Sequence, residues 1–429
     1  MANSNKALAS MSAQELRARQ QELQAAYDGY KAKGLQLDMS RGKPGAAQLA
    51  LTVDLLESVT AQDGWVAENG FDARNYGVMD GLPEAKALFA DILHVDASQI
   101  IVGGNSSLNM MFDYIATAYS VGVCGHAPWS QQGKVKFLCP VPGYDRHFAV
   151  TQFFGIELIP VDMTAEGPDM DQVESLIADP LVKGMWCVPM YSNPDGITYA
   201  DNTVRRLAAM TPAAPDFRIM WDNAYCLHHL YDEGEELLDL YPELVKCGHE
   251  DMAVMFTSTS KISFPGGGVA ALAASPANIA DIKRRLTVQT IGPDKINMLR
   301  HVRYFKDIDG IRAHMKKHAA VLRPRFEAVL DALAENLGDR GIASWHNPRG
   351  GYFVSVNLMD GCATRTVELL RQAGVVMTPA GATYPYGRDP RDSNIRIAPS
   401  YPSVEDLTVA MAMFCVCAEL ACIEKLLEK

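Results

Sequence analysis

Short apolar runs recur along the first two thirds of the chain and alternate with stretches of helical spacing. Six runs fall between residues 99 and 260, namely "QIIVGG", "KVKFLCPVP", "IELIPVDM", "GMWCVPMY", "FRIMWDNAY" and "DMAVMFTSTS". Runs of this length that are apolar at consecutive positions are typical of strands buried on both faces. Their alternation with helices predicts a mostly parallel sheet in a doubly wound α/β domain.

The helical pattern differs at the two ends of the chain. Ser12 and Glu15 form a capping-box pattern, which predicts a first helix from about Ser12 to Lys33. A long charged helix is predicted over about residues 300 to 335, and we expect Pro324 to break or kink it. Strand signals then return in "GGYFVSVNL" and "SNIRIAPSY".

These changes of pattern predict the domain organisation. A chain of 429 residues exceeds the size at which one core usually stops growing. We expect a large α/β domain over residues 51–305. The N-terminal residues 1–50 and the C-terminal residues 306–429 are expected to form a smaller α+β domain together.

Composition and charge narrow the class of partner. Hydrophobic residues make up 48% of the chain and charged residues 21%, as in ordinary soluble globular proteins. The net charge of -12 argues against nucleic acid or an anionic membrane surface as the main partner. The nine cysteines lack paired spacing and the N-terminus lacks a secretory pattern, so we expect a cytoplasmic protein. Cys415, Cys417 and Cys422 fit the buried face of a terminal helix better than a metal site.

Polar residues follow several of the predicted strands, where ligands of parallel sheets bind. Ser106 and Ser107 lie in a turn before a helix, which suits an anion, although small residues are also common in plain turns. Asn193 lies in "NPDG", which is also an ordinary turn sequence. Asp222 ends an apolar run, where it serves either a ligand or a helix cap. Lys261 follows a further strand and is surrounded by small residues.

The order of these residues indicates a cofactor. A phosphate cradle, an amide, a buried carboxylate and a lysine amine at successive strand ends are what pyridoxal phosphate (PLP) requires. The small residues around Lys261 leave room for a ring and its phosphate. The sequence therefore predicts a PLP enzyme.

The chain resembles the PLP-dependent aminotransferases of fold type I, class I/II, over nearly its whole length. The resemblance is carried, in the family order, by "RNYGVMDGLPEAKALFA", "VGGNSSLNMMFD", "PVPGYDRH", "YSNPDGITY", "WDNAY", "STSKISFPGGG", "PRGGYFVSV" and "SNIRIAPSY". It is closest to the bacterial aspartate-aminotransferase-like, or alanine-glyoxylate-like, subgroup. It implies the PLP-transferase fold, with a mostly parallel sheet of the seven-stranded type in the large domain.

The resemblance also implies roles for individual residues. Lys261 would form the internal aldimine and carry the substrate proton, while Asp222 would hold the pyridine nitrogen. Tyr225 and Asn193 would bond the phenolic oxygen of the ring. Tyr144 would stack on the ring. The phosphate would be held by Gly104, Asn105, Ser106 and Ser258.

The substrate side is implied in the same way. Arg396 would bind the substrate α-carboxylate, Asn193 would also contact the substrate, and Gly42 would lie in a segment that closes over the substrate. Arg41 and Lys43 fit either a contact with a distal carboxylate or a solvated loop. Tyr76 would reach the phosphate of the neighbouring subunit's cofactor, which implies a homodimer with shared sites.

One position departs from the family pattern. Family members carry a phosphate-binding arginine about eight residues after the lysine, whereas this chain has Val269 there. Backbone N–H groups of the three glycines at 266–268, or a cation from elsewhere, are the two replacements the sequence leaves open. His314 and His318 have metal-binding spacing but no third ligand in the sequence, so no metal is expected.

The implied activity is transfer of an amino group between an amino acid, with aspartate favoured, and 2-oxoglutarate by a ping-pong mechanism. A PLP-dependent lyase of the same fold, such as a C–S lyase or an aminocyclopropane-carboxylate synthase, uses the same lysine, carboxylate and arginine. A PLP-binding regulator is disfavoured because it needs a DNA-binding domain, and this acidic chain has one amphipathic helix before the matched region. Amino acids and 2-oxo acids are therefore the expected partners.

Overall fold

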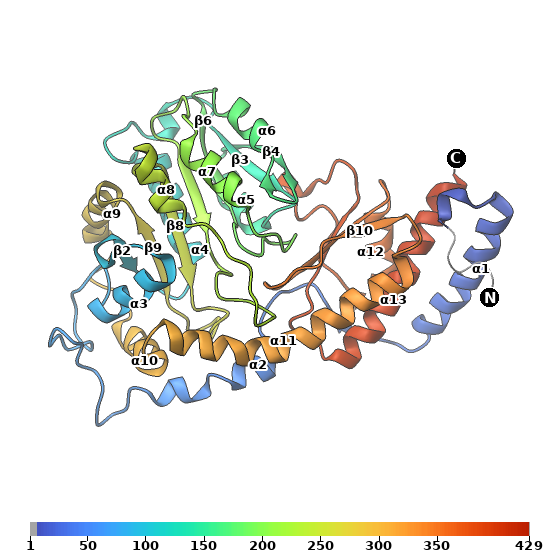
Figure 1. Ribbon diagram of the computed structural model, residues 1–429, viewed down its shortest axis with the longest axis horizontal. Coiled ribbons are helices and arrows are strands. Elements are labelled where there is room, and N and C mark those ends of the chain that lie inside the picture. Colours follow the sequence, from blue (N-terminus) through green and yellow to red (C-terminus); the bar gives the residue numbers. More distant parts are fainter. Residues whose placement is uncertain (1–6, 429) are drawn as a thin grey trace.

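The computed structural model of the protein describes residues 7–428 and contains a large and a small sheet (Figure 1). The large sheet has the strand order β2-β9-β8-β7-β6-β3-β4-β5. The strands from β8 to β4 are parallel, while β2, β9 and the two-residue β5 pair antiparallel at the edges. The predicted mostly parallel sheet is therefore confirmed, with β5 as an extra short strand. The strands are β2 (Ile100–Val102), β3 (Lys136–Val141), β4 (Glu157–Thr164), β5 (Gly167–Pro168), β6 (Val182–Cys187), β7 (Arg218–Asp222), β8 (Ala253–Ser258) and β9 (Ala270–Ala274).

Helices cover both faces of this sheet, because its strands are apolar on both sides. One face packs on α4 (Ser107–Ser120), α5 (Asp145–Phe153) and α9 (Pro276–Gln289). The other face packs on α3 (Pro83–Leu93), α6 (Met170–Leu176), α7 (Asp201–Ala209), α8 (Leu240–Cys247) and α10 (Lys295–Phe305). The short 3-10 helices are η1 (Leu8–Ser10), η2 (Val53–Glu57), η3 (Ala97–Gln99), η4 (Trp129–Gln131), η5 (Glu250–Met252) and η6 (Pro385–Gly387).

The second sheet is antiparallel and has the order β10-β11-β13. Its core is shared with the first helix of the chain, since Leu16, Leu23 and Tyr27 pack in the same cluster as the C-terminal helix. The predicted capping box of Ser12 and Glu15 is present at the start of that helix. The elements are α1 (Ala13–Lys31), β10 (Ala343–Trp345), β11 (Val354–Leu358), α12 (Ala363–Gln372), β13 (Asn394–Ile397) and α13 (Val404–Leu427).

The N-terminal segment that follows α1 is attached at two places. Strand β1 (Leu37–Asp38) pairs in parallel with β12 (Val375–Val376). Helix α2 (Ala46–Ala50) carries Gln48, whose amide nitrogen donates to Tyr352 Oη at 2.8 Å and lies 3.1 Å from His318 Nδ1. His318 in turn lies 3.1 Å from His314. Residues 39–45 therefore run between two fixed points.

The long predicted helix is interrupted at a different place from the one the sequence suggested. The predicted helix over residues 300 to 335 is two helices, α10 and α11 (Ile308–Leu337), separated at Lys306, whose φ is 68°. Asp307 caps α11 by accepting from the backbone N–H of Gly310 at 2.8 Å. Pro324 lies inside α11 without ending it, so the predicted break at Pro324 is wrong, while the alternative of a kink there stays a prediction.

One helix among the described residues, α13, is long and apolar enough to cross a membrane by composition, but most of it is buried in the core of the protein. Cys415, Cys417 and Cys422 are among its buried side chains, as their spacing predicted. Arg19 of α1 donates to both oxygens of the buried Glu419 at 2.9 Å. The apolar composition of α13 therefore reflects packing inside the fold.

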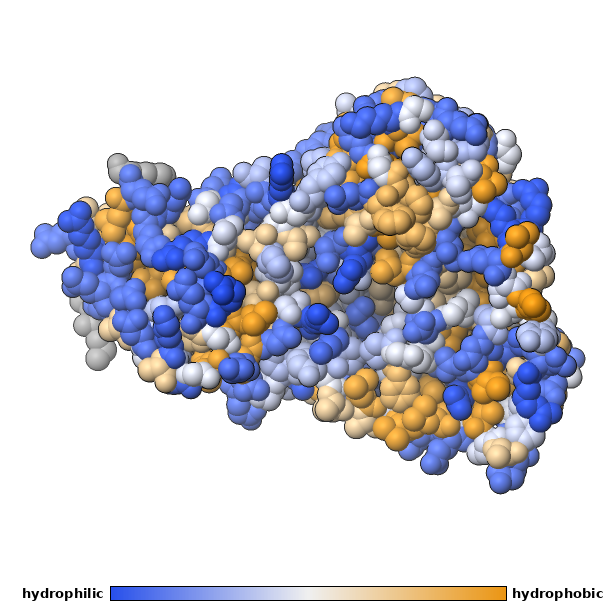
Figure 2. All heavy atoms as spheres, turned by 180° about the vertical axis from the view of Figure 1, so that it is seen from behind, coloured by the Kyte–Doolittle hydropathy of each residue, from blue (hydrophilic) through white to orange (hydrophobic). Residues whose placement is uncertain are grey.

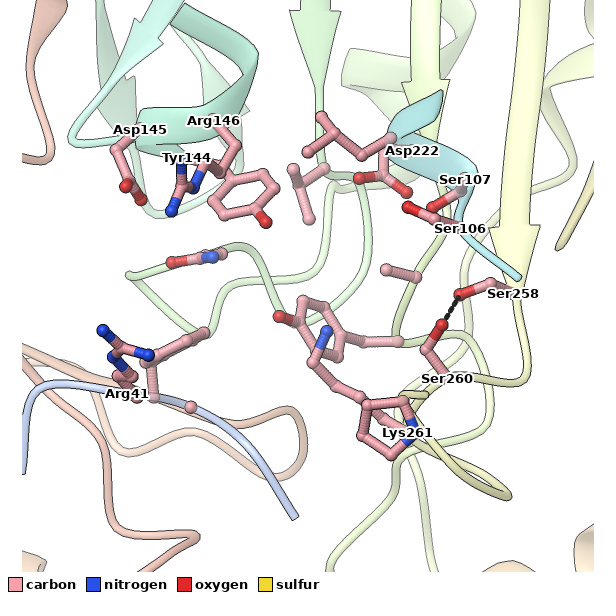
Figure 3. A pocket seen from close by; sticks show the side chains of 18 of the residues that line it. Arg41, Ser106, Ser107, Tyr144, Asp145, Arg146, Asp222, Ser258, Ser260 and Lys261 are labelled. Atoms are coloured by element: carbon pink, nitrogen blue, oxygen red, sulfur yellow. Dashed lines mark hydrogen bonds between the residues drawn. The ribbon is translucent and has the colours of Figure 1, made fainter. Parts of the chain in front are cut away.

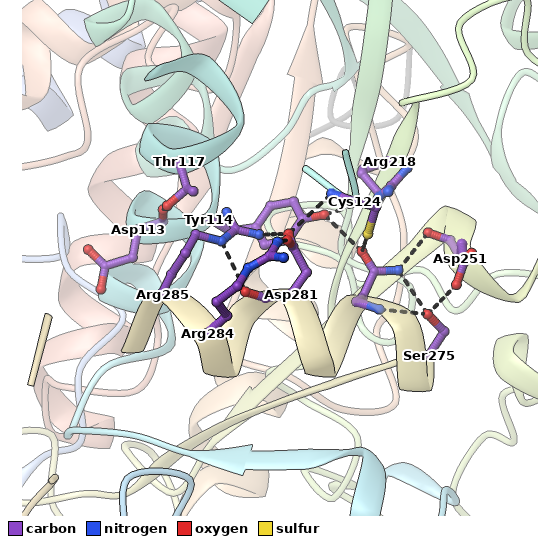
Figure 4. A network of polar contacts seen from close by, with 11 residues as sticks. Asp113, Tyr114, Thr117, Cys124, Arg218, Asp251, Ser275, Asp281, Arg284 and Arg285 are labelled. Carbon is purple, nitrogen blue, oxygen red and sulfur yellow. Dashed lines mark hydrogen bonds and ion pairs between the residues drawn. The ribbon is translucent and has the colours of Figure 1, made fainter. Parts of the chain in front are cut away.

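A polar network fixes the helix that begins at the carboxyl edge of the large sheet (Figure 4). Tyr114 of α4 accepts from Arg218 Nε at 3.0 Å and donates to Asn278 of α9 at 3.3 Å. Asp281 of α9 accepts from the backbone N–H of Cys124 at 3.1 Å and pairs with Arg284 and Arg285. The network joins α4, α9 and β7 into one rigid support.

Candidate active site

A cavity of about 560 Å³ lies at the carboxyl edge of the large sheet and is also lined by residues of the small sheet (Figure 3). Loops that follow neighbouring parallel strands converge at this edge, which brings distant parts of the chain together. The predicted site residues that line the cavity are Gly42, Asn105, Ser106, Tyr144, Asn193, Asp222, Tyr225, Ser258, Lys261 and Arg396.

Two predicted site residues lie elsewhere. Gly104 lines a second cavity of about 350 Å³ beside α4, and its carbonyl accepts from the backbone N–H of Ala270 at 2.8 Å. Tyr76 is 76% exposed and does not line the first cavity. One copy of the chain therefore does not bring Tyr76 to the predicted site.

Asp222 ends β7 with its carboxylate buried and only half satisfied. Its side chain lies next to the cavity and the residue is 4% exposed. Oδ2 lies 3.0 Å from Nε2 of His147, but no residue in the described range bonds to Oδ1. A buried carboxylate oxygen without a donor is costly. This oxygen is therefore suited to accept a hydrogen bond from a ligand N–H.

His147 is a site residue that the sequence reasoning missed. It lies in the first turn of α5, three residues after Tyr144, and its ring stacks on Trp186 with centroids 4.4 Å apart. The stacking and the bond to Asp222 fix the orientation of the carboxylate. The spacing in "YDRH" places Tyr144 and His147 on one helix face and could have signalled this role.

A group of hydroxyls and a helix start form an anion-binding corner of the cavity. Ser106 is the N-cap of α4 but makes no side-chain cap hydrogen bond, which leaves the hydroxyl and the first N–H groups for another acceptor. Ser258 donates to Ser260 at 3.1 Å, and Ser260 donates to the carbonyl of Asn105 at 3.1 Å. The two loops are thus joined, and their hydroxyls suit a phosphate.

The three glycines after Lys261 are not part of this corner. Gly266, Gly267 and Gly268 do not line the cavity within the described residues, whereas Pro265 does. The carbonyls of Gly267 and Gly268 accept from Asn297 Nδ2 at 2.9 and 3.0 Å. The glycines therefore serve the turn that packs on α10.

Lys261 is half-buried, and its side chain lies beside two aromatic rings. Nζ is 5.0 Å from the ring centroid of Tyr225 and 5.7 Å from that of Tyr352. Burial raises the pKa of Tyr225, and a hydrogen bond with Asn193 opposes this shift. Burial also raises the pKa of Tyr144 to about 12, and the positive charge of Lys261 opposes that shift. Both phenols are therefore neutral hydrogen-bond donors near pH 7.

Arg396 of β13 presents a guanidinium from the opposite side of the cavity. Its Nη1 donates to Asp145 Oδ1 at 3.0 Å and to Asn193 Oδ1 at 3.3 Å, and the guanidinium carbon lies 4.8 Å from the ring centroid of Phe353. Gly42 crosses the same ring so closely that an added Cβ would lie 2.3 Å from it. The glycine lets the N-terminal segment pass over Phe353 next to the guanidinium.

Asp195, in the loop after β6, links the two sides of the cavity through its hydrogen bond with Ser355 of β11. Burial raises the pKa of Asp195 to about 7, against the effect of this bond, which favours the charged form. Ser355 also accepts from Asn394 Nδ2 of β13 at 2.9 Å. The loop that carries Asn193 is thereby attached to the small sheet.

The arrangement fits pyridoxal phosphate on its own chemistry. One cavity is lined by phenol and amide donors for the ring oxygen and by a hydroxyl-rich helix start for the phosphate. It is also lined by a carboxylate that can meet the pyridine N–H and by a lysine amine, and within residues 7–428 neither the Oδ1 of that carboxylate nor the amine has a hydrogen-bond partner. The fold and these groups define the class of PLP-dependent aminotransferases of fold type I.

Comparison with known proteins gives the family within this class. The family model described as aspartate amino-transferase matches residues 11–429. An aspartate aminotransferase of Corynebacterium glutamicum is 45% identical over 94% of both chains. The crystal structure of an aspartate transaminase from that organism has a TM-score of 0.96 and 43% identity, and covers 99% of this chain and 100% of its own. The chain belongs to the aspartate aminotransferase family.

A more distant solved structure shows how widely the fold extends. An α-aminoadipate aminotransferase of Thermus thermophilus, complexed with N-(5'-phosphopyridoxyl)-L-leucine, has a TM-score of 0.70 at 17% identity, and covers 93% of this chain and 95% of its own. At that identity the likeness concerns the fold alone.

Proposed function

We propose that the protein transfers the amino group of aspartate to 2-oxoglutarate in two half-reactions at one site. The observation that carries the proposal is the charge of the cavity. Arg41, Arg146, Lys261 and Arg396 line it, against the carboxylates Asp145 and Asp222. Substrates with two carboxylates suit a site in which arginines are available beyond the one that binds the α-carboxylate. The aspartate aminotransferase relative at 45% identity supports this choice of substrate.

The residues of the chain would divide the chemistry between them. When bound, PLP supplies an electron sink for the substrate Cα. Asp222, held by His147, would keep the pyridine nitrogen protonated through its free oxygen. Lys261 would attach the cofactor and then carry the proton from Cα as general base. Tyr225 and Asn193 would hold the ring oxygen, and Tyr144 would cover the ring and limit the access of water.

We further propose a homodimer in which Tyr76 serves the site of the partner. Figure 2 shows hydrophobic patches on the face opposite to that of Figure 1. Tyr76 and Ile291 are 76% and 64% exposed, and the loops that carry them are joined by a bond of 3.0 Å from Gly77 N to Ile291 O. Exposed apolar side chains that lie together mark interaction surfaces. We also propose a cytoplasmic location, since all nine cysteines are free.

The test is a steady-state assay of the holoenzyme with aspartate, glutamate, alanine and aromatic donors against 2-oxoglutarate. The highest kcat/KM is expected for aspartate, with the parallel double-reciprocal lines of a ping-pong mechanism. Turnover of an amino acid without any 2-oxo acid, with release of ammonia, would instead indicate a lyase. A clear preference for a monocarboxylic donor would contradict the proposed substrate.

A further inference from the structure

The guanidinium of Arg396 is bonded through Nη1, but among the described residues its buried Nε has no hydrogen-bond partner. Nη1 donates to both Asp145 and Asn193, at 3.0 and 3.3 Å. Nε is buried and has no hydrogen-bond partner among the described residues, and Arg396 as a whole is only 8% exposed. The ring of Phe353 lies 4.8 Å from the guanidinium carbon. A buried donor without an acceptor indicates that the Nε edge is kept for a ligand.

Asp145 belongs to α5, a helix that packs on the large sheet, whereas Arg396 belongs to the small sheet. It is the first residue of α5, where a carboxylate interacts favourably with the helix dipole, and its side chain is 35% exposed. Two residues further along the same helix turn, His147 holds Asp222. The start of α5 therefore fixes a carboxylate that faces the cofactor side and a guanidinium that faces the substrate side.

We propose that Asp145 is a positioning residue for the substrate α-carboxylate, and this inference rests on the proposed function. By taking Nη1, Asp145 would leave Nε and Nη2 as the edge of the guanidinium that is available to a carboxylate. A bidentate bond to a carboxylate needs two parallel N–H groups of this kind, and its strength depends on their orientation. Asp145 would contact Arg396 and not the substrate.

A competing role for Asp145 would change carboxylate binding in the opposite direction. If Asp145 competed with the substrate for Arg396, its removal would strengthen carboxylate binding. If it positions Arg396, its removal weakens binding of every ligand that carries an α-carboxylate, and leaves ligands without one unaffected. The sign of the change therefore decides between the two roles.

The experiment uses two capture reagents on the PLP-loaded protein. Aminooxyacetate and methoxyamine both react with the bound cofactor to give an oxime, but only aminooxyacetate carries a carboxylate. Their capture rates are followed by absorbance for the wild type and for Asp145→Ala, Asp145→Asn and Arg396→Lys. Asp201→Asn is the matched control, because Asp201 also pairs with an arginine at 3.0 Å but lies on the exposed surface of α7.

Capture by aminooxyacetate should fall about tenfold to a hundredfold in Asp145→Ala, while capture by methoxyamine stays within about twofold. Asp145→Asn, which can still accept from Nη1, should lose less. In the Arg396→Lys background, Asp145→Ala should add little, because the two residues act as one unit. KM for amino donor and 2-oxo acid should rise together, with a smaller change in kcat.

Faster capture by aminooxyacetate in Asp145→Ala would overturn the inference in favour of competition. Equal loss of both capture rates in both Asp145 variants would assign Asp145 to cofactor binding or folding and would also overturn it. Neither result depends on turnover of aspartate, so failure of the proposed function is recognised separately, in the donor assay of the wild type.

Discussion

The two walls of the cavity are built in different ways. The wall from the large sheet carries Asp222, Tyr225 and Ser258, which are at most 9% exposed and lie at or just after the ends of neighbouring strands. The opposite wall carries Arg41 and Gly42 from the N-terminal segment and Arg396 from β13, and these two segments are more than 350 residues apart in the sequence. The first wall is set by the edge of one sheet and suits a resident cofactor. The second exists only when remote segments pack, and it suits a substrate that comes and goes.

The sharpest test of the first wall is Lys261→Ala. Transamination should fall more than about 10⁴-fold, the upper range for a lost general base, because no second lysine lines the cavity in the part of the chain that the structure describes. PLP should still bind through the hydroxyl corner, measured by equilibrium dialysis. In the wild type, borohydride should fix the cofactor to Lys261, as shown by peptide mapping. Fixation on another lysine would place the reactive amine elsewhere.

The next largest effect is expected for Asp222→Ala, with a loss in kcat of about 10³-fold, because this variant would remove the charge that is proposed to hold the pyridine proton. His147→Gln should cost about tenfold, since the carboxylate stays and only its orientation loosens. Thermal unfolding should show that both variants are folded. Turnover of Asp222→Ala within a few-fold of the wild type would make Asp222 a structural residue.

Hybrid dimers test whether one wall is completed by the partner. Tyr76→Ala and Arg396→Ala should each be strongly impaired alone. In an equal mixture that exchanges subunits, about a quarter of all sites would have both residues intact, and activity should return to that extent. Each variant must first be shown to be dimeric. No recovery after proven exchange, or a monomer by sedimentation, would contradict the shared site.

Gly42→Ala should affect the second wall alone. The added Cβ would displace the Phe353 ring that lies against Arg396. We expect KM for the amino donor to rise several-fold, about the effect of a small misplacement of a binding group, while the affinity for PLP is unchanged. Fluorescence titration with PLP measures the second quantity. An equal change in both would mean that the walls are coupled.

The smallest effect is expected for Asp195, whose hydrogen bond with Ser355 links the two walls of the cavity. The pKa of Asp195 is raised by burial to about 7, above its value in an unfolded chain. Its protonated form therefore stabilises the fold below the unfolded pKa, and this contribution is lost as the pH rises through about 7. The unfolding temperature of Asp195→Asn minus that of the wild type should be larger at pH 8 than at pH 5. The same difference at both pH values would exclude titration of Asp195.

The first wall could be predicted from sequence much better than the second. Asp222 and Lys261 follow apolar runs, so strand recognition alone placed them at one edge. His147 escaped because its role depends on packing against Asp222, which lies 75 residues away. The pairing of Arg396 with Asp145, 251 residues away, has no local signal at all. The helix break at Lys306 did have one, since Asp307 and Gly310 form a cap, but Pro324 was the more conspicuous residue.

The double attachment of residues 39–45 has a mechanical consequence. One end is paired with β12, and the other is bonded through Gln48 to Tyr352, the neighbour of Phe353. Gly42 in this segment lies against the ring of Phe353, and the guanidinium carbon of Arg396 lies 4.8 Å from the same ring, so the segment, the ring and the guanidinium pack in series. We therefore expect a displacement of residues 39–45 to be transmitted through the Phe353 ring to the guanidinium of Arg396.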